Sequence, residues 1–409
     1  MAVGNTPFPA LPPLEGVRLG SAMAGIKKPN RRDVVVIELP ATATVAGVFT
    51  RNAFCAAPVL VAKQHLEQCR AEQRSPRFWL VNTGNANAGT GDAGLRDARA
   101  SCAELAQRAG VAVEDVLPFS TGVIGEPLPM ERLLAGLTPA LESMASDSAA
   151  WENAGQGILT TDTRAKGATV SLDVDGQQVT INGITKGSGM IKPNMATMLG
   201  FVVTDATIEV SLLDRLLRET VDRSFNCITV DSDTSTNDAC MLAATGTGPR
   251  IVDDAQITAF REALQQVMTE LAQAIIRDGE GATKFITLQV DDARSRQEAL
   301  DVAFTVAHSP LVKTALYASD ANWGRILAAV GRAPVDDFDV NRVVIELGDV
   351  RLVEHGGRAD GYTEAAGSAV MAASDITIRI SLGRGDESAT VWTSDLSHDY
   401  VSINADYRS

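Results

Sequence analysis

Residues 186–203, KGSGMIKPNMATMLGFVV, place a glycine-rich turn and a proline directly before a run of apolar residues. Such a run after a turn predicts a buried strand, here Met198–Val203. The hydroxyl of Thr197, at the start of that strand, could attack the carbonyl of its own preceding residue. The simpler interpretation is that Thr197 is only a β-branched residue that opens the strand. The segment taken alone favours this simpler interpretation, because self-cleaving proteins are rare.

Cleavage of the chain before Thr197 would turn this residue into a catalytic group. If the Ala196–Thr197 bond breaks, Thr197 becomes an N-terminus whose α-amine can activate its hydroxyl for covalent catalysis. An α-amine titrates at about 7.7–8.0, which is close enough to neutral pH for a general base. Two alternatives are therefore open for Thr197, a strand residue or an N-terminal nucleophile.

The composition narrows the class of protein. The chain has 409 residues, of which 45% are hydrophobic, enough for two or three domains or for one large domain with an appendage. A net charge of −15 without a Lys/Arg-rich run makes nucleic acid and anionic membranes poor partners, although a local basic pocket remains possible. No signal peptide is predicted at the start, and no apolar run approaches the ~20 residues of a membrane span. We expect a soluble, cytoplasmic protein.

Cysteines and histidines form no pattern of a metal site or a disulfide framework. The five cysteines are scattered without a CxxC pair, and each is interpreted as a buried small apolar residue. The four histidines form no HExxH motif, and no GxSxG motif occurs. We therefore assign no metal ligands.

Helical and strand patterns alternate along the chain. The clearest helix is Ile257–Ile276, where apolar residues recur at helical spacing. Further helices are predicted at Leu95–Ala109, Ser211–Arg223, Ser309–Leu316 and Trp323–Val330. Strands are predicted at Asp33–Leu39, Phe78–Val81, Ala168–Val174, Gln178–Asn182, Met198–Val203, Thr283–Val290, Val343–Leu347 and Ile376–Ile380. The mixture indicates an α/β or α+β fold, with the charged stretch Asp291–Ala299 as the best candidate for a domain boundary.

GTGDAG, residues 89–94, matches the GxGxxG pattern of dinucleotide-binding folds, and Glu114 and Asp115 follow at about the distance of the ribose contact. Two features oppose this interpretation. Asn82–Asn87 separate the strand from the glycines, whereas the fingerprint needs a tight turn, and the acidic pair lies in a turn rather than at a strand end. A dinucleotide-binding oxidoreductase is kept as the alternative from another functional class.

Several short polar segments are weak signals on their own. We interpret NTGNANAG (82–89) as turns, and GILTTDT (157–163) and SDTSTND (232–238) as capping and turn chemistry. In FSTGVIGEPLP (119–129), Thr121 and Gly122 could present a hydroxyl and an N–H to a developing oxyanion. Glu280, in DGEGATK, could face a cationic substrate group, and Lys186 could face a substrate carboxylate. Both could equally be solvated surface charges.

Taken together, these segments resemble one enzyme family, ornithine acetyltransferase of arginine biosynthesis, also described as glutamate N-acetyltransferase. The matching segments run in the same order from about residue 8 to the end: NTGNANAGTGD, FSTGVIGEPLP, TTDT, KGSGMIKPNMATML, SDTSTND, DGEGATK, SDANWGR and INADYRS. The segment around Thr197 and the terminal INADYRS are the most specific.

The resemblance implies self-cleavage between Ala196 and Thr197 into an α chain, residues 1–196, and a β chain, residues 197–409, which assemble as an α2β2 heterotetramer. It implies an α/β fold, a layered sandwich of the N-terminal-nucleophile type over about residues 1–290. A smaller C-terminal α/β domain, about residues 291–409, would follow, with a tail that returns to the active site.

The resemblance also implies the site residues. Thr197 is expected to be the nucleophile and, through its freed amine, the base, while Thr121 and Gly122 form the oxyanion hole. Substrate contacts are implied for Thr160, Lys186, Thr197, Glu280, Asn404 and Ser409.

The implied reaction is ping-pong transfer of an acetyl group from N2-acetyl-L-ornithine to L-glutamate through an acetyl-threonine, with no bound cofactor. Family members differ in whether acetyl-CoA is a further donor, and no single residue here decides that. A self-processing aminopeptidase or amidase, in which water takes the acyl group, is the alternative within the same chemistry. A purely structural protein would show no processing.

Overall fold

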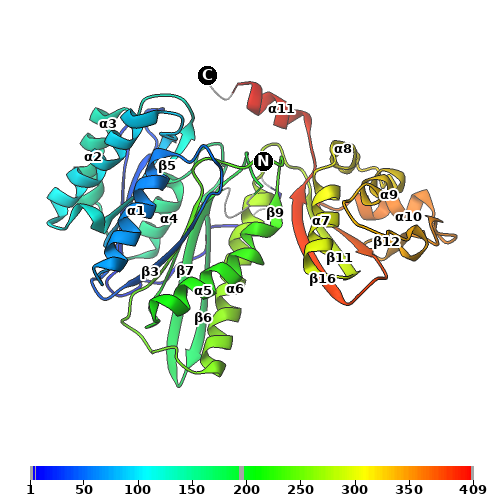
Figure 1. The fold of residues 1–409 in the computed structure, drawn as a ribbon. Coiled ribbons are helices and arrows are strands. Elements are labelled where there is room, and N and C mark those ends of the chain that lie inside the picture. Colours follow the sequence, from blue (N-terminus) through cyan, green and yellow to red (C-terminus); the bar gives the residue numbers. More distant parts are fainter. Residues whose placement is uncertain (1–2, 5, 193–197, 407–409) are drawn as a thin grey trace.

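A computed structural model describes residues 3–4, 6–192 and 198–406, so the Ala196–Thr197 bond and Ser409 lie outside the described residues. The predicted α/β class is confirmed. Two stacked sheets with helices on their outer faces form the larger body, and a third sheet with its own helices forms a second body towards the C-terminus (Figure 1).

The first sheet of the larger body has its strands in the spatial order β1 (Arg18–Ala22), β2 (Val34–Glu38), β4 (Phe78–Asn85), β5 (Val116–Val123). Only β4 and β5 are parallel among these neighbours. The helices on its outer face are α1 (Ala57–Ala71), α2 (Gly91–Ala109) and α3 (Met130–Glu142). Val34 and Leu80 of the sheet meet Leu105 and Leu133 of the helices in one apolar cluster.

The second sheet has the order β3 (Thr44–Phe49), β10 (Ala239–Ala244), β8 (Leu199–Thr204), β7 (Gln177–Lys186), β6 (Lys166–Val174). Helices α5 (Val210–Asp222) and α6 (Asp254–Arg277) cover its outer face. The predicted stripe of α6 is confirmed from Phe260 to Ile276, whereas Ile257 at its start is only partly buried. The burial of this stripe fixes α6 against the sheet.

The two sheets face each other across an aromatic core. Trp79 of β4 and Phe119 of β5 pack on Phe201 of β8, with ring centroids 5.5 and 5.1 Å apart. Helix α4 (Ser148–Gly157) adds Trp151 to the same cluster. Burial of such large rings contributes much of the stability of a core, and here it packs β4 and β5 of the first sheet against β8 of the second.

The third sheet has the order β14 (Gly357–Arg358), β13 (Val350–Glu354), β12 (Val344–Leu347), β15 (Asp375–Ser381), β11 (Phe285–Ala293), β16 (Glu387–Ser394), β9 (Ile228–Thr229). Its helices are α7 (Arg296–Ala307), α8 (Pro310–Tyr317), α9 (Trp323–Gly331) and α10 (Glu364–Met371). Short 3-10 turns occupy Val113–Asp115, Phe225–Cys227 and Val340–Arg342. Strand β9 precedes α6 in the chain but pairs with β16, so it links the two bodies. The final helix α11 (His398–Ala405) then runs back above the larger body (Figure 1).

One local prediction is wrong, and one helix was not predicted. The strand predicted at Phe78–Val81 continues to Asn85, so residues 82–85 are not turns. Their buried amides are satisfied inside the sheet, for example where Ser120 Oγ donates to Asn82 Oδ1 at 2.5 Å. The first residues of the terminal INADYRS belong to α11, a helix that Ser397 caps and that the sequence analysis did not predict. This helix escaped prediction because it is short and has no buried stripe.

The cysteine prediction holds for four positions, since Cys69, Cys102, Cys227 and Cys240 are buried, whereas Cys55 is half-buried. None of the helices in the described ranges combines the length and the hydrophobicity of a membrane span.

Candidate active site

A cavity of about 250 Å³ opens where the ends of β5, β7 and β8 meet α11. Its lining includes six residues that the sequence predicted for the site: Thr121, Gly122, Thr160, Lys186, Glu280 and Asn404. Met198 and Leu199, which directly follow residue 197, also line it. Thr197 and Ser409 themselves lie outside the described residues. The fold thus brings together residues that are up to 283 positions apart in the chain, as from Thr121 to Asn404.

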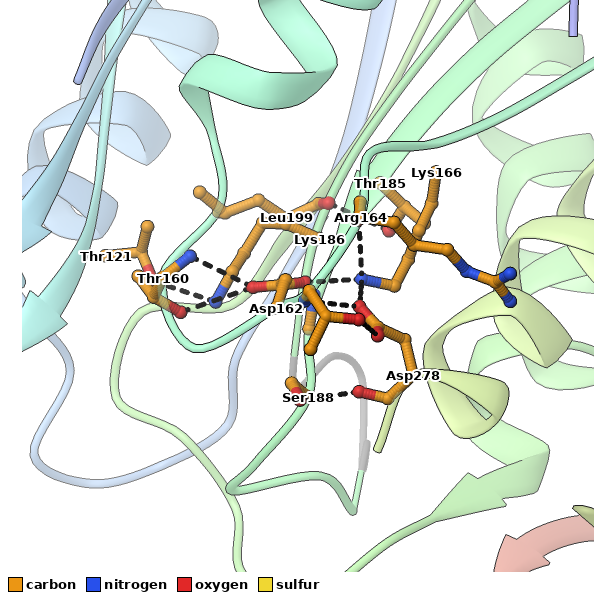
Figure 2. A network of polar contacts seen from close by, with 12 residues as sticks. Thr121, Thr160, Asp162, Arg164, Lys166, Thr185, Lys186, Ser188, Leu199 and Asp278 are labelled. Atoms are coloured by element: carbon orange, nitrogen blue, oxygen red, sulfur yellow. Dashed lines mark hydrogen bonds and ion pairs between the residues drawn. The ribbon is translucent and has the colours of Figure 1, made fainter. Parts of the chain in front are cut away.

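Lys186 and Thr121 form the centre of this cavity. Lys186 is the last residue of β7, and its Nζ donates to Thr121 Oγ1 at 3.2 Å (Figure 2). Burial lowers the pKa of the Lys186 ammonium, and the negative charges of Asp162, Asp238 and Glu280 offset part of that effect. Because an ammonium can only donate, it takes a lone pair of the Thr121 hydroxyl and leaves the hydroxyl proton available to another acceptor.

Gly122, beside Thr121 in β5, occupies a position that needs glycine. Its φ of +136° disfavours any side chain, and a Cβ there would lie 2.3 Å from the carbonyl carbon of Gly84 on β4. The close approach of these two strands therefore depends on a residue without a side chain at position 122.

Glu280 connects the loop after α6 to the C-terminal helix. Its Oε2 accepts from Asn404 Nδ2 at 2.7 Å, and its backbone N–H donates to the Ser188 carbonyl at 3.1 Å. A Cβ on Gly189 would lie 2.3 Å from Glu280 Oε2, so the glycine-rich turn leaves room for this carboxylate. Ser397 Oγ, which donates to the Gly281 carbonyl at 2.6 Å, fixes the start of α11 on the same loop.

A buried network of ion pairs next to Lys186 was not predicted from the sequence. Lys166 Nζ lies 2.6 Å from Asp162 Oδ1 and 2.6 Å from Asp278 Oδ2, with all three side chains fully buried (Figure 2). Burial raises the pKa of Asp162, but the ammonium groups of Lys166 and Lys186 outweigh it and hold that pKa below its usual range. Asp162 Oδ1 also accepts from the N–H of Gly187 at 2.7 Å. The network thereby fixes the backbone that carries Lys186.

The only sequence signal for this network is TTDT with a lysine four positions after its aspartate, and Asp278 is 112 positions away from that lysine. Such a spacing suggests an ion pair only on a helix, whereas Asp162 lies in a loop and Lys166 starts β6. No local pattern could therefore have identified it.

Asp238, the last residue of SDTSTND, is a second residue that was missed. It is fully buried in the cavity wall, and its Oδ2 has no hydrogen-bond partner among the described residues. Burial raises the pKa of this carboxyl well above its usual range, although Ser235, Lys186 and the amide of Met198 oppose the shift. Its neighbour Asn237 donates to the carbonyls of Ala86 and Ser120 at 2.6 and 2.9 Å, so it positions β5 rather than a turn. The segment was interpreted as turn chemistry because burial is not visible in so polar a run.

In the structure, side chains of the loop around the GxGxxG segment occupy the space where the dinucleotide-binding alternative would place its ligand. Asn87 Nδ2 donates to the Gly94 carbonyl at 2.9 Å, and Thr90 Oγ1 donates to Asn87 Oδ1 at 2.8 Å. A dinucleotide fingerprint instead keeps this loop open for the pyrophosphate. Glu114 and Asp115 lie in a 3-10 turn, as expected from the sequence, and not at a strand end.

Comparison with known proteins identifies relatives over the whole chain. A model of the ArgJ family matches residues 18–409. An arginine biosynthesis bifunctional protein ArgJ of Pseudomonas syringae pv. tomato is 55% identical over 413 residues, with 100% of both chains covered. A crystal structure of an arginine biosynthesis bifunctional protein ArgJ from Bacillus halodurans is 38% identical, with a TM-score of 0.48 and coverage of 50% of this chain and 97% of that one. A crystal structure of an ornithine acetyltransferase complexed with ornithine, from Mycobacterium tuberculosis, is 34% identical. Its TM-score is 0.38, and the match covers 45% of this chain and 94% of that one.

Proposed function

This chain belongs to the ArgJ family, and from that premise we propose that it transfers an acetyl group from N2-acetyl-L-ornithine to L-glutamate in arginine biosynthesis. The observation that carries the proposal is the charge pattern of the cavity, where Lys186 and Glu280 line the same space as Thr121 and Gly122. Amino acids carry charges of both signs, so a buried cation and a buried carboxylate that line one cavity suit them. The cytoplasmic location stays a prediction.

In the proposed reaction, Thr197 Oγ attacks the acetyl carbonyl, and the α-amine freed by self-cleavage takes the hydroxyl proton. Thr121 and Gly122 donate to the oxyanion, and loss of one such donor typically costs ~3 kcal/mol of barrier. The contact from Lys186 supports this role, because it leaves the Thr121 proton for the oxyanion and adds a positive charge nearby. Ornithine leaves with a proton on its amine. The amine of glutamate then attacks the acetyl ester, which gives N-acetylglutamate and restores the Thr197 hydroxyl.

We further propose that the two products of self-cleavage stay associated and form an α2β2 assembly. The order of the second sheet supports the association, since β8 and β10 of the β chain lie between β3 and β7 of the α chain. β3 pairs with β10, β10 with β8, and β8 with β7, so every strand neighbour at these boundaries is bound by ladder hydrogen bonds. Separation of the chains would break this sheet and leave buried backbone groups without hydrogen-bond partners, whereas cleavage of one peptide bond leaves these strand pairings in place. The division into a sandwich over about 1–290 and a C-terminal domain over about 291–409 belongs to the same proposal.

Mixing the purified protein with N2-acetyl-L-ornithine and L-glutamate tests the proposal directly. Mass spectrometry should detect N-acetylglutamate together with free ornithine. Release of free acetate without acetylglutamate would point instead to the amidase alternative, in which water is the acceptor. Absence of both products would contradict the proposed function.

Replacement of Lys186 by methionine is expected to raise the KM for acetylornithine about tenfold, equivalent to ~1.4 kcal/mol. The substrate carboxylate would lose its only buried cation partner in the described cavity lining. Steady-state kinetics would measure the effect. Lys313→Met is the matched control, because Lys313 is equally buried but donates to Thr393 and lies in the second body. An unchanged KM in the Lys186 variant would remove this residue from substrate binding.

Removal of residues 404–409 is expected to raise the KM or lower kcat while the protein remains folded. The deletion removes the Asn404 contact to Glu280, whereas Ser397 still attaches α11 to the Gly281 loop. Circular dichroism would check the fold, and kinetics would check the activity. The single variant Asn404→Ala should show part of the same loss. Kinetics identical to those of the full chain would exclude the tail from the site.

A further inference from the structure

Asp238 is a buried group in the wall of the active-site cavity to which the proposed reaction assigns no role. Its side chain is only 3% exposed, it lines the cavity together with Met198 and Leu199, and its Oδ2 has no hydrogen-bond partner within residues 3–4, 6–192 and 198–406. Native structures rarely bury a carboxyl oxygen without a partner, because the lost bonds to water are then not replaced. Such an oxygen in a cavity wall indicates a partner that arrives with the substrate or with processing of the chain.

The second sheet places Asp238 beside the start of β8. β10 and β8 run parallel with Ala239 opposite Leu199, and the N–H of Ala239 donates to the Met198 carbonyl at 3.0 Å. On its other side, the Asp238 carbonyl accepts from the N–H of Thr50 at 3.0 Å. Asp238 directly precedes Ala239, so the paired strands hold its backbone next to Met198.

The Asp238 carboxyl is bound to the chain right after the cleavage position. The backbone N–H of Met198 donates to it. Because consecutive backbone nitrogens are joined by only three bonds, they cannot be more than about 3.7 Å apart. A carboxyl that binds the Met198 N–H is therefore within reach of the amine that self-cleavage would free at residue 197, and Oδ2 is its oxygen without a partner in the described ranges.

The charges around Asp238 favour a cation at this oxygen. Lys186 adds a positive charge nearby, but its ammonium donates to Thr121 at 3.2 Å. Burial outweighs that charge and raises the pKa of the Asp238 carboxyl well above its usual range. An ammonium beside a carboxyl acts in the opposite direction, because it favours the ionised form. A cationic amine at Oδ2 would therefore offset part of the cost of burying this carboxyl.

We propose that Asp238 is a positioning residue for the α-amine freed at residue 197, with Oδ2 as the acceptor of one of its N–H bonds. The inference rests on the function proposed above. A neutral amine has two N–H bonds and one lone pair, so a hydrogen bond to an oxygen fixed by the sheet restricts where the lone pair can point. In this arrangement the lone pair faces the Thr197 hydroxyl, which it must deprotonate.

The proton balance of the reaction stays as proposed. As Thr197 Oγ bonds to the acetyl carbon, the hydroxyl proton passes to the α-amine, and the ammonium so formed faces the Asp238 carboxylate. The C–N bond of the acetyl group then breaks, and the same proton leaves on the amine of ornithine. Asp238 accepts a hydrogen bond in this cycle and transfers no proton itself. Its negative charge makes the α-amine a stronger base.

The test uses Asp238→Asn, which keeps the size of the side chain and an oxygen for the Met198 N–H but removes the charge. The matched control is Asp205→Asn, because the Asp205 carboxyl is half-buried at the other end of β8 and accepts the N–H of Thr180 at 2.8 Å. Both variants should give two chains by intact mass. In Asp238→Asn we expect kcat to fall about 10- to 100-fold, with the KM for acetylornithine changed less than twofold. The control should match the wild type.

The pH profile separates this role from a purely structural one. Without the negative charge of Asp238, the pKa of the α-ammonium falls, so the acid limb of kcat/KM should move to lower pH in Asp238→Asn. The limb should not move in the control. The other titratable groups around Asp238 are the same in variant and wild type, and they are Lys186, Glu280, Lys63 and Cys55, with Asp162 and Lys166 behind Lys186.

A crystal structure of the processed wild-type protein tests the contact without any substitution. The α-nitrogen of residue 197 should lie at hydrogen-bond distance, about 2.7–3.2 Å, from Asp238 Oδ2. A separation beyond about 4 Å would overturn the inference, since no hydrogen bond spans it.

Four kinetic or processing results would also overturn it. An Asp238→Asn chain that stays at full mass would show that the carboxyl acts before the amine exists. A raised KM with unchanged kcat would assign Oδ2 to substrate binding. Superimposable pH profiles, or an equal loss in Asp205→Asn, would leave Asp238 with a structural role only. In each case, acetylglutamate formed by the wild type keeps the proposed function intact, whereas a wild type that forms none counts against that function instead.

Discussion

Thr197→Ala is expected to leave the chain at its full mass of 43.1 kDa and to abolish acetyl transfer. Without the hydroxyl, no group at this position can attack the carbonyl of residue 196, so no new N-terminus forms. Loss of a covalent nucleophile typically lowers kcat roughly a million-fold. Intact mass under denaturing conditions would measure processing, and acetylglutamate formation would measure activity. Wild-type protein should give two species that divide between Ala196 and Thr197.

Thr197→Ser provides the matched control, because serine keeps the hydroxyl and should still be processed and active at a lower rate. An alanine variant that is uncleaved yet active would end the proposed mechanism. An alanine variant that is cleaved normally would show that another residue or a protease cuts the chain. The stability of the variant can be checked by thermal melting.

Lys166→Met is expected to lower the free energy of unfolding by about 3–5 kcal/mol at neutral pH. The ammonium of Lys166 lies between Asp162 and Asp278, and its removal leaves two fully buried carboxylates without their main counter-charge. Urea denaturation would measure the loss. Activity should fall as well, because Asp162 holds the Gly187 N–H next to Lys186.

The pH dependence follows from the same network. The pKa of Asp162 lies below its usual range in the folded protein, so its stabilising contribution is present above the unfolded pKa and is lost as the pH falls through the folded pKa. In the methionine variant, Asp162 has lost the counter-charge of Lys166, and its protonation in acid relieves part of the penalty, so the difference between variant and wild type should shrink as the pH falls.

Arg218→Met is the control for the loss of an ion pair as such, since Arg218 pairs with Asp214 at the surface with a side chain that is 52% exposed. A surface pair of this kind contributes at most about 1 kcal/mol. Equal destabilisation by the Lys166 and Arg218 variants would contradict the role assigned to the buried network.

Much of the local structure was predictable, and the errors have physical causes. Helix α6 was recognised because a long amphipathic stripe is a strong periodic signal. Strand β4 was cut short at Val81 because its second half, Asn82–Asn85, is made of residues that usually form turns. The sheet overrides that preference, since Ser120 of the neighbouring strand β5 and the Asn85 carbonyl of β4 itself satisfy the buried amide of Asn82. Propensity is a weak signal where tertiary partners are available.

The sequence by itself determined the class of fold, the family and the residues from which a site was predicted, because short motifs keep their identity and order along the chain. Only the tertiary structure decided how those residues meet. The contacts of Lys166 with Asp278, of Lys186 with Thr121 and of Glu280 with Asn404 join positions 65 to 124 residues apart. No local period encodes such distances. The burial that shifts the pKa of Asp238 arises in the same way, from chain segments that only folding brings together.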